Sequence, residues 1–262
     1  MERDVADTVI AVIPARYAST RFPGKALALI SGQPMIVRVL ERVGRARGIS
    51  RVVVATDDER IAKAVRGAGG EALMTSPSHT SGTERIAEVA AAHVAPFYLN
   101  VQGDEPLVEP AALEDLMGGM DALGGHESTP AVGTLATPLR DLLDAADPRV
   151  VKVVTDFSGN ALYFSRTPIP HTREDVDATG SMPRPGKERP AMWKHLGVYY
   201  YRRDVLLEFP KLPPGRLERL EQLEQLRLLE HGYRIHVVET PHDTVSVDHP
   251  SDVARVEAIL KK

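Results

Sequence analysis

The chain has 262 residues, of which 43% are hydrophobic and 26% are charged, and it carries a formal net charge of −4. This is the composition of a globular protein with a substantial core. The mild acidity argues against a general nucleic-acid binder, which usually presents a basic surface. The absence of cysteine excludes disulfides and thiolate metal sites and fits a reducing compartment.

The N-terminus is charged and lacks the apolar core of a signal peptide. No apolar run approaches the roughly 20 residues that a transmembrane helix needs. We therefore expect a cytoplasmic protein whose partners include neither a membrane nor a nucleic acid.

The first hundred residues contain four apolar runs that are typical of strands. The runs are residues 8–14, 51–56, 70–75 and 97–101. The first two have the continuous apolar character of strands that are buried on both faces of a sheet.

Helical patterns separate these runs. Residues 34–48 form an amphipathic pattern with one apolar face. Thr56 and Glu59 have the spacing of a capping box, which predicts a second helix. Ser81 and Glu84 repeat that spacing before a third helix. The alternation predicts a doubly wound, Rossmann-like α/β fold with a mostly parallel sheet and helices on both faces.

The second half of the chain is less regular. The sequence predicts first a hairpin from residues 150–156 and 160–166, then a long Pro-rich loop over 167–192 and a strand over 195–202. A strong helix is predicted over 215–232, with leucines 217, 220, 223 and 226 in the core. Strands over 233–239 and 244–248 and a closing helix over 250–260 follow. There is neither an internal repeat nor a flexible linker, so we expect one domain over residues 1–262.

The stretch IPARYASTRFPGK, residues 13–25, follows the first predicted strand and carries Arg16, Arg21 and Lys25. Ligands of open parallel sheets bind beyond the carboxyl ends of the strands. Arginine offers paired donors to phosphate oxygens, and lysine adds a movable charge. We interpret this loop as a polyphosphate site in preference to a surface turn with solvated cations.

Two carboxylates follow strand patterns further along the chain. Asp104 lies in NVQGDEP, and Asp248 lies in SVDHPSDV. Alone, the first stretch gives some evidence of a metal ligand against an Asp-containing turn, whereas the second is better explained as a helix entry with a favourable negative charge. Together they predict a Mg²⁺ site, because Mg²⁺ takes one or two carboxylates plus substrate phosphates. His242 and His249 lack zinc-site spacing, and we interpret them as structural or solvent-facing.

The stretch SGTER, residues 81–85, leaves two readings open. Backbone N–H groups at the start of a helix bind anions, and Arg85 is long enough to reach a ligand there. A capping box alone accounts for the same residues equally well. From the residues alone, the sequence therefore predicts a Mg²⁺-polyphosphate site suited to nucleotide transfer, without naming the substrate.

The order and spelling of the motifs add a resemblance. IPARYASTRFPGK, VVVATDD, SGTERIAE, NVQGDEP, HLGVYYYR, LEQLEQLR and SVDHPSD occur in the order seen in the 3-deoxy-manno-octulosonate (Kdo) cytidylyltransferase family, which this chain resembles over about residues 8–260. The resemblance implies a Mg²⁺-dependent reaction in which CTP and Kdo give CMP-Kdo and pyrophosphate for lipopolysaccharide synthesis. It also implies a fold of the nucleotide-diphospho-sugar transferase type and a homodimer formed through residues 150–202.

The resemblance further implies roles for individual residues. It places the CTP phosphates on Arg16, Ser19, Thr20 and Lys25, with Arg21 as a weaker member, and the cytosine and ribose near Thr83 and Arg85. It places Gln102 and Asp104 against the nucleotide, Mg²⁺ on Asp104 and Asp248, the Kdo carboxylate on Arg166, and the sugar hydroxyls on His195, Tyr199, Glu224 and Gln225. Arg16, Lys25, Asp104 and Asp248 are the residues expected to carry catalysis.

Some alternatives remain at this point. Another sugar acid, such as an 8-amino Kdo or a sialic acid, requires few changed contacts, although sialate enzymes typically show a first loop closer to RGGSKGI. A nucleotide sensor without activity predicts the loss of Lys25 or of a metal carboxylate, and both carboxylates are present. An NAD-dependent oxidoreductase requires a Gly-rich turn after the first strand, and that turn is absent. Ser246 and His249 replace the Gly and Thr that the family pattern leads us to expect.

Overall fold

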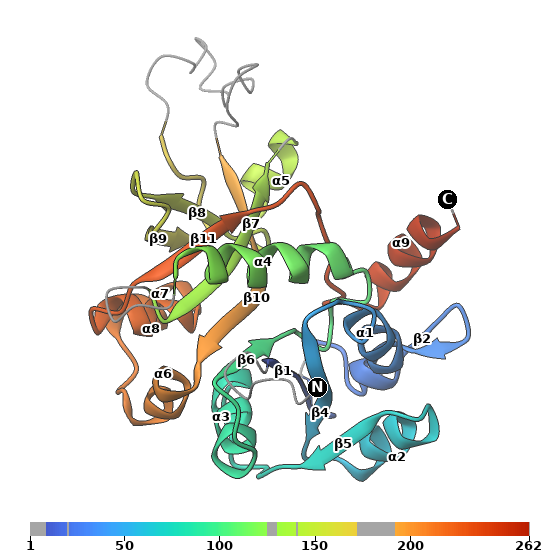
Figure 1. The fold of residues 1–262 in the computed structure, drawn as a ribbon. Helices are drawn as coiled ribbons and strands as arrows, with labels where there is room; N and C mark the ends of the chain where they lie inside the picture. The colour runs from blue at the N-terminus through green and yellow to red at the C-terminus, as the bar shows by residue number, and fades with distance from the viewer. Residues whose placement is uncertain (1–8, 20, 125–129, 140, 172–191, 262) are drawn as a thin grey trace.

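The computed structural model describes residues 9–19, 21–124, 130–139, 141–171 and 192–261. Its main sheet follows the order β11-β7-β10-β6-β1-β4-β5 (Figure 1). These strands are β11 (Ile235–Glu239), β7 (Val132–Pro138), β10 (Trp193–Arg202), β6 (Phe97–Asn100), β1 (Val9–Ala15), β4 (Ile49–Thr56) and β5 (Glu71–Met74). Four of the six pairings along this path are parallel, and the two that involve β10 are antiparallel. The prediction of a mostly parallel α/β sheet is confirmed.

The other strands of the described residues form a hairpin and a short two-stranded ribbon. The hairpin of β8 (Lys152–Thr155) and β9 (Ala161–Ser165) joins the main sheet through β10, which confirms the predicted hairpin. Strands β2 (Leu29–Ile30) and β3 (Gln33–Pro34) form a separate short ribbon.

Helices cover both faces of the sheet. They are α1 (Met35–Val43), α2 (Glu59–Gly67), α3 (Gly82–Ala92), α4 (Pro110–Ala122), α5 (Leu142–Ala146), α6 (Arg203–Glu208), α7 (Arg216–Glu221), α8 (Gln225–Glu230) and α9 (Pro250–Leu260). Among these described elements, no helix is long and apolar enough to cross a membrane.

Strand β1 shows why both faces need a cover. Val9, Ala11 and Ile13 pack in one apolar cluster with residues of α1, α2 and α4. Ile10 and Val12, which point to the opposite face, pack in a second cluster with residues of α3, α6 and α8. Successive residues of a strand point to opposite faces, so a continuously apolar strand requires a core on each side.

The predicted helix over 215–232 is wrong in one respect, because two short helices replace it. Gln222 lies between α7 and α8 with φ 54° and ψ 50°, a left-handed conformation that stops the first helix. The break also changes the predicted core, since Leu223 and Leu226 are buried but Leu220 is 68% exposed. The predicted strand over 244–248 is also wrong, because that segment pairs with no strand among the described residues.

Smaller differences concern helix ends and a region without a prediction. The side chain of Asp58, and not that of Thr56, caps α2 by accepting from the Arg60 N–H. Helix α1 ends at Val43, earlier than predicted. Helix α4 and strand β7 fall in a region for which we had no prediction. Most of the predicted Pro-rich loop, residues 172–191, lies outside the described residues.

Candidate active site

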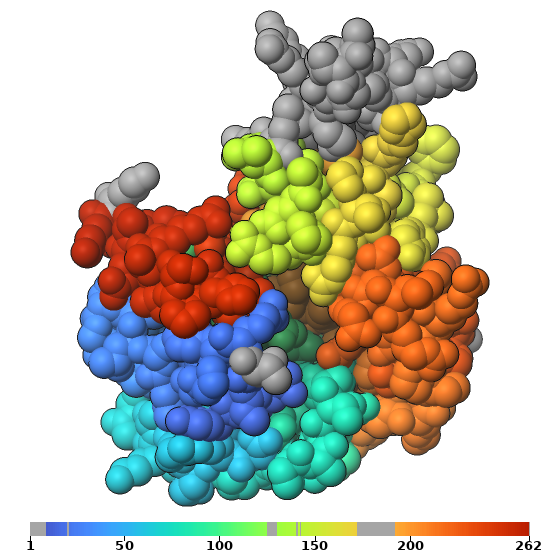
Figure 2. Space-filling model, turned by 180° about the vertical axis from the view of Figure 1, so that it is seen from behind, coloured from blue at the N-terminus to red at the C-terminus, as the bar shows by residue number. Residues whose placement is uncertain are grey.

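Two adjoining cavities open beyond the carboxyl ends of β1 and β6, where Figure 2 shows the surface hollowed between the first loop, the hairpin and α7–α8. The loop cavity has a volume of about 270 Å³, and its lining includes Arg16, Ser19, Arg21, Lys25, Ser81, Gly82, Arg85 and Asp104. The β10 cavity has a volume of about 360 Å³, and its lining includes Thr83, Arg166, His195, Tyr199, Gln225 and Asp248. Gln102 and Glu224 line both cavities.

The first loop is shaped by its own backbone. The Gly24 N–H donates to the Tyr17 carbonyl oxygen at 3.0 Å, and Gly24 adopts φ 71°, where a side chain would be strained. A Cβ there would also lie 3.2 Å from the Tyr17 ring. The Arg60 guanidinium covers the same ring at 3.4 Å from its centroid. The loop therefore has a defined shape that leaves Arg16 exposed at the cavity.

The Lys25 ammonium lies close to both carboxylates that the sequence predicts as Mg²⁺ ligands, those of Asp104 and Asp248. Its Nζ lies 2.5 Å from Asp104 Oδ2 and 3.6 Å from Asp248 Oδ1. Arg21 reaches Asp248 Oδ1 at 2.9 Å. The expected proximity of Asp104 and Asp248 is therefore present, although a paired strand does not carry Asp248. Its segment is placed instead by the Val247 N–H, which donates to the Asp104 carbonyl oxygen at 2.9 Å.

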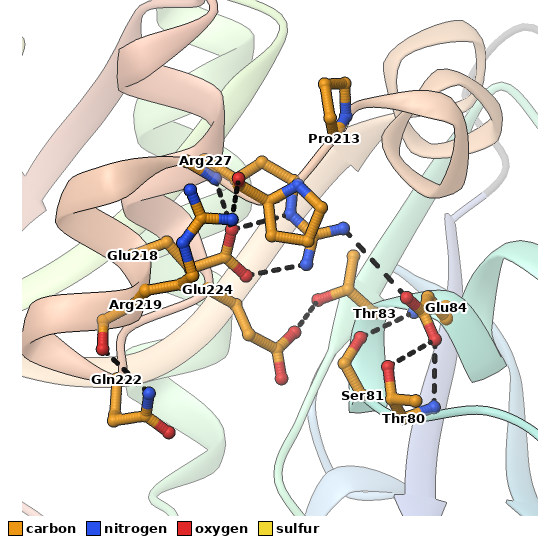
Figure 3. Close-up of polar contacts among 12 residues, drawn as sticks. Thr80, Ser81, Thr83, Glu84, Pro213, Glu218, Arg219, Gln222, Glu224 and Arg227 are labelled. Atoms are coloured by element: carbon orange, nitrogen blue, oxygen red, sulfur yellow. Dashed lines mark hydrogen bonds and ion pairs between the residues drawn. The ribbon is translucent and has the colours of Figure 1, made fainter.

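The N-terminus of α3 connects the two cavities (Figure 3). Ser81 caps the helix by accepting from the Glu84 N–H, which is one half of the predicted capping box. The Thr83 hydroxyl donates to Glu224 Oε2 at 2.9 Å. Arg85 is buried, and its guanidinium donates to Asp57 Oδ2 at 3.0 Å and also to Thr75. The stretch therefore caps α3 and also contributes to the lining of both cavities.

His195 is buried at the floor of the β10 cavity, and burial lowers its pKa to about 3, so the ring is neutral. The Thr134 hydroxyl lies 2.9 Å from its Nε2 and 2.8 Å from the Val198 carbonyl oxygen. A hydroxyl has one proton, and the carbonyl can only accept it. We therefore assign the ring proton to Nε2, which leaves Nδ1 as an acceptor. Burial likewise raises the pKa of Tyr199 well above its ordinary value.

Two further polar groups of the β10 cavity are those of Arg166, which backbone contacts align, and of Gln225, whose amide nitrogen lacks a partner among the described residues. The Arg166 guanidinium donates to the carbonyl oxygens of Glu221, Pro148 and Gln222 at 2.7, 3.0 and 3.1 Å. These carbonyls orient the charge without neutralising it. The amide nitrogen of Gln225 is buried and has no hydrogen-bond partner among the described residues, which is unusual for a buried donor.

Comparisons with known proteins show the family to which this chain belongs. A family model described as Cytidylyltransferase matches residues 10–235. A 3-deoxy-manno-octulosonate cytidylyltransferase of Geobacter sulfurreducens is 53% identical, over 97% of this chain and 99% of the relative. One of Syntrophotalea carbinolica is 52% identical over the same shares of both chains. The chain belongs to the 3-deoxy-manno-octulosonate cytidylyltransferase family.

Solved structures agree with this membership of the cytidylyltransferase family. A structure of CMP:2-keto-3-deoxy-manno-octonic acid synthetase complexed with CTP matches with a TM-score of 0.85 and 42% identity, over 97% of this chain and 98% of that one. A 4-diphosphocytidyl-2C-methyl-D-erythritol synthase from Anaerococcus prevotii matches with a TM-score of 0.61 at 12% identity, which shows a shared fold only.

The residues that the cytidylyltransferase resemblance singled out fall into the two cavities in an ordered way. The loop cavity holds Arg16, Ser19, Arg21, Lys25, Arg85, Gln102 and Asp104. The β10 cavity holds all five residues expected at the sugar, namely Arg166, His195, Tyr199, Glu224 and Gln225, together with Asp248. Thr83, expected near the nucleotide, lines the β10 cavity instead. Thr20 lies outside the described residues.

Glu105 is a site residue of this cytidylyltransferase to which the sequence assigned no role. Burial and, to a smaller extent, the neighbouring Asp104 charge raise its pKa to about 7. Its Oε2 accepts from the Thr244 hydroxyl at 2.6 Å, and both residues line the β10 cavity. Its place beside Asp104 was the only sequence signal. The burial comes from residues 139 positions away in the chain, which a local pattern does not reveal.

Proposed function

We propose that the chain transfers CMP from CTP to the anomeric hydroxyl of Kdo and releases pyrophosphate. The observation that carries this proposal is the division of the site into two cavities that share Gln102 and Glu224. The loop cavity holds Arg16, Arg21 and Lys25 of the first loop, and the β10 cavity holds the Arg166 guanidinium, the neutral His195 and the Gln225 amide among acidic and basic side chains. Relatives named 3-deoxy-manno-octulosonate cytidylyltransferase and a related structure complexed with CTP support the same assignment.

The chemistry requires positioning more than a covalent nucleophile. The hydroxyl oxygen of the sugar attacks the α-phosphorus of CTP, the bond from that phosphorus to the bridging oxygen breaks, and the hydroxyl loses its proton. Lys25, Arg16 and Arg21 lie where the triphosphate would place its charge, and such cations stabilise the charge that develops on the leaving pyrophosphate.

The β10 cavity suits a sugar acid. A carboxylate pairs with the Arg166 guanidinium, whose acceptors in the structure are backbone carbonyls. Nδ1 of the neutral His195 accepts a hydrogen bond from a hydroxyl, and the buried Gln225 amide nitrogen donates one. Such contacts hold the sugar so that its attacking oxygen faces the loop cavity.

We also propose that Asp104 and Asp248 hold Mg²⁺. Their oxygens already converge on one cation, the Lys25 ammonium, which shows that the pair can share a positive charge. Among the described residues, no group of three or more acidic or histidine side chains makes a metal site by itself. This fits Mg²⁺, which commonly takes two carboxylates and completes its coordination with substrate phosphates and water. When bound, the ion neutralises phosphate charge.

The Asp104→Asn variant tests the metal assignment. We expect kcat/KM to fall by roughly 100-fold or more, because a lost carboxylate removes several kcal/mol of charge stabilisation. Asp204→Asn, which changes an ion-paired aspartate outside both cavities, serves as the matched control and should behave like the wild type. The assay is pyrophosphate release across a Mg²⁺ titration. Robust turnover by Asp104→Asn at the same Mg²⁺ concentrations would contradict the assignment.

A panel of sugar acids tests the substrate. The purified protein is incubated with CTP and Mg²⁺ and, separately, with Kdo, 8-amino Kdo, a sialic acid and neutral sugars, while pyrophosphate is measured. We expect Kdo to be preferred and the neutral sugars to be inactive, because they lack the carboxylate that pairs with Arg166. Turnover of a different sugar acid in place of Kdo would contradict the assignment of Kdo as the substrate, but not the assignment of the reaction as cytidylyl transfer to a sugar acid.

We further propose that the protein is a cytoplasmic homodimer whose product serves lipopolysaccharide assembly, and that residues 1–262 form one domain. The hairpin supports the dimer, since Phe157 at its turn is fully exposed and Leu162 on β9 is 62% exposed. Large apolar side chains exposed together commonly mark an interface.

A further inference from the structure

The four residues from the end of α7 to the first residue of α8, residues 222–225, all line the β10 cavity. Gln222, Leu223, Glu224 and Gln225 all belong to its wall. An α-helix has 3.6 residues per turn, so four consecutive residues point around its whole circumference. The continuous helix predicted from the sequence would therefore turn some of them away. The break between the helices is what lets all four face one cavity. We call this segment the α7–α8 corner.

Gln222 makes the corner. Its left-handed conformation is normally a glycine position, because a Cβ there is crowded by the backbone. The backbone N–H groups of Gln222 and Leu223 both reach the Glu218 carbonyl oxygen, the latter at 3.3 Å. Its own side chain folds back so that Nε2 donates to the Arg219 carbonyl oxygen at 2.8 Å (Figure 3).

The corner is also tied to Arg166. The Arg166 guanidinium donates to the last two carbonyls before the turn, those of Glu221 and Gln222, at 2.7 and 3.1 Å. The Arg166 N–H donates to the Glu221 carboxylate at 3.0 Å. Arginine has five N–H donors, so these carbonyls and that of Pro148 leave two for a ligand.

The other end of the corner is fixed as well. Glu224 accepts from the Thr83 hydroxyl at 2.9 Å, so the corner rests against α3 (Figure 3). Arg227 in α8 makes a bidentate ion pair with Glu218 in α7, at 2.8 and 2.6 Å, and this pair closes the angle between the two helices. The separation between the Arg166 charge and the Glu224 carboxylate is therefore determined by the backbone at Gln222.

We propose that Gln222 is a positioning residue for the sugar acid, acting through its left-handed backbone. The corner orients Arg166 for the carboxylate of the substrate and, in the same turn of chain, aims Glu224 and Gln225 at its hydroxyls. This inference rests on the proposed function, because it concerns the sugar side of the same reaction. It assigns Gln222 itself no role in binding CTP, since within the corner only Glu224 also lines the loop cavity.

Two substitutions separate the backbone from the side chain. Gln222→Gly removes the side chain but favours the left-handed conformation. Gln222→Val disfavours that conformation, because valine is β-branched. We expect Gln222→Gly to keep the KM values for Kdo and CTP within about twofold of the wild type. We expect Gln222→Val to raise the KM for Kdo roughly fivefold or more while the KM for CTP stays within about twofold.

Two further variants are needed as controls. Leu220→Val introduces the same side chain at an exposed position inside α7 and should leave both KM values unchanged. Gln222→Ala has a smaller conformational penalty, and we expect a smaller rise in the KM for Kdo alone. It keeps the test valid if Gln222→Val fails to fold, which thermal unfolding will show.

Several results would overturn the inference. An equal rise in both KM values would indicate a general structural role. If Gln222→Gly raises the KM for Kdo, the side chain of Gln222, and not its backbone conformation, positions the sugar acid. If folded Gln222→Val has unchanged kinetics, the corner has no role in positioning the sugar acid. The wild type separates this failure from that of the proposed function. If it accepts another sugar acid, the variants are compared on that acid, and if it accepts none, both proposals fail.

Discussion

At the scale of single residues, burial keeps two rings of the β10 cavity neutral, those of His195 and Tyr199, among the acidic and basic side chains that also line it. Burial pushes the pKa of His195 down and that of Tyr199 up, so both rings are uncharged near neutral pH. The Arg166 guanidinium, oriented by three backbone carbonyls, is the group that we expect to pair with the carboxylate of a sugar acid. An oriented guanidinium beside neutral hydrogen-bonding rings suits a ligand with one carboxylate and several hydroxyls.

The buried His195 also makes stability depend on pH. Its folded pKa of about 3 lies below the value near 6.5 of an unfolded histidine. Between these values the unfolded chain binds more protons, so the free energy of unfolding falls as the pH drops below about 6.5. From pH 7.5 to 5.0 this one group removes about 2 kcal/mol.

Urea unfolding of the wild type and of His195→Asn at both pH values measures this contribution. Because all other titrating groups are common to the two proteins, the stability advantage of the wild type should shrink by about 2 kcal/mol at the lower pH. A difference in free energy of unfolding that does not change with pH would show that His195 protonates equally in the folded and unfolded chains.

Residues of the first loop could be predicted from sequence because the loop is local. Arg16, Arg21 and Lys25 lie within ten positions of one another and follow a recognisable strand. Glu105 and Gln222 could not be predicted in the same way. The environment of Glu105 comes from Thr244, and the left-handed conformation of Gln222 occurs at a residue type that seldom signals one.

At the scale of elements, regular sequence patterns predicted where strands and helices lie, but strand-like composition alone did not predict whether a segment pairs with another strand. The strands β1 and β4 could be predicted because strands buried on both faces of a parallel sheet are continuously apolar. Residues 244–248 have the composition of a strand but no partner among the described strands, and strand preference without a neighbour does not make a sheet. Helix α4 escaped prediction because Gly118 and Gly119 weaken its helical pattern.

The prediction of a homodimer rests on the exposed apolar side chains of the β8–β9 hairpin. Light scattering should give a mass of about twice the chain mass of 28.6 kDa. Phe157→Asp should shift the protein toward the monomer, because it places a charge at the centre of the proposed interface. Val94→Asp, at a residue that is 76% exposed outside the hairpin, should leave the mass unchanged. A wild-type monomer at assay concentrations, or an unaffected Phe157→Asp dimer, would contradict this assignment.

At the scale of the whole molecule, β10 is the element that assembles the site. It runs antiparallel between β6 and β7 and so brings residues of the C-terminal half beside the end of β6. His195 and Tyr199 thereby lie near the loops that carry Lys25 and Asp104. The sequence predicted the two sets of residues but not their division into adjoining cavities, because that division depends on the reversed direction of β10 and on the α7–α8 corner.

The formal net charge of −4 is consistent with a polyphosphate substrate, because Arg16, Arg21 and Lys25 place several cations together at the loop cavity. Local charge at the site, and not the total, decides which anion binds.

The fate of the α-phosphate of CTP tests the proposed transfer most directly. The wild-type protein is incubated with Kdo, Mg²⁺ and CTP that carries a radioactive α-phosphate, and the products are separated. We predict that the label enters a sugar nucleotide in step with one pyrophosphate released per label transferred. Label that appears only in free CMP or CDP, or release of orthophosphate in place of pyrophosphate, would contradict transfer of CMP to the sugar.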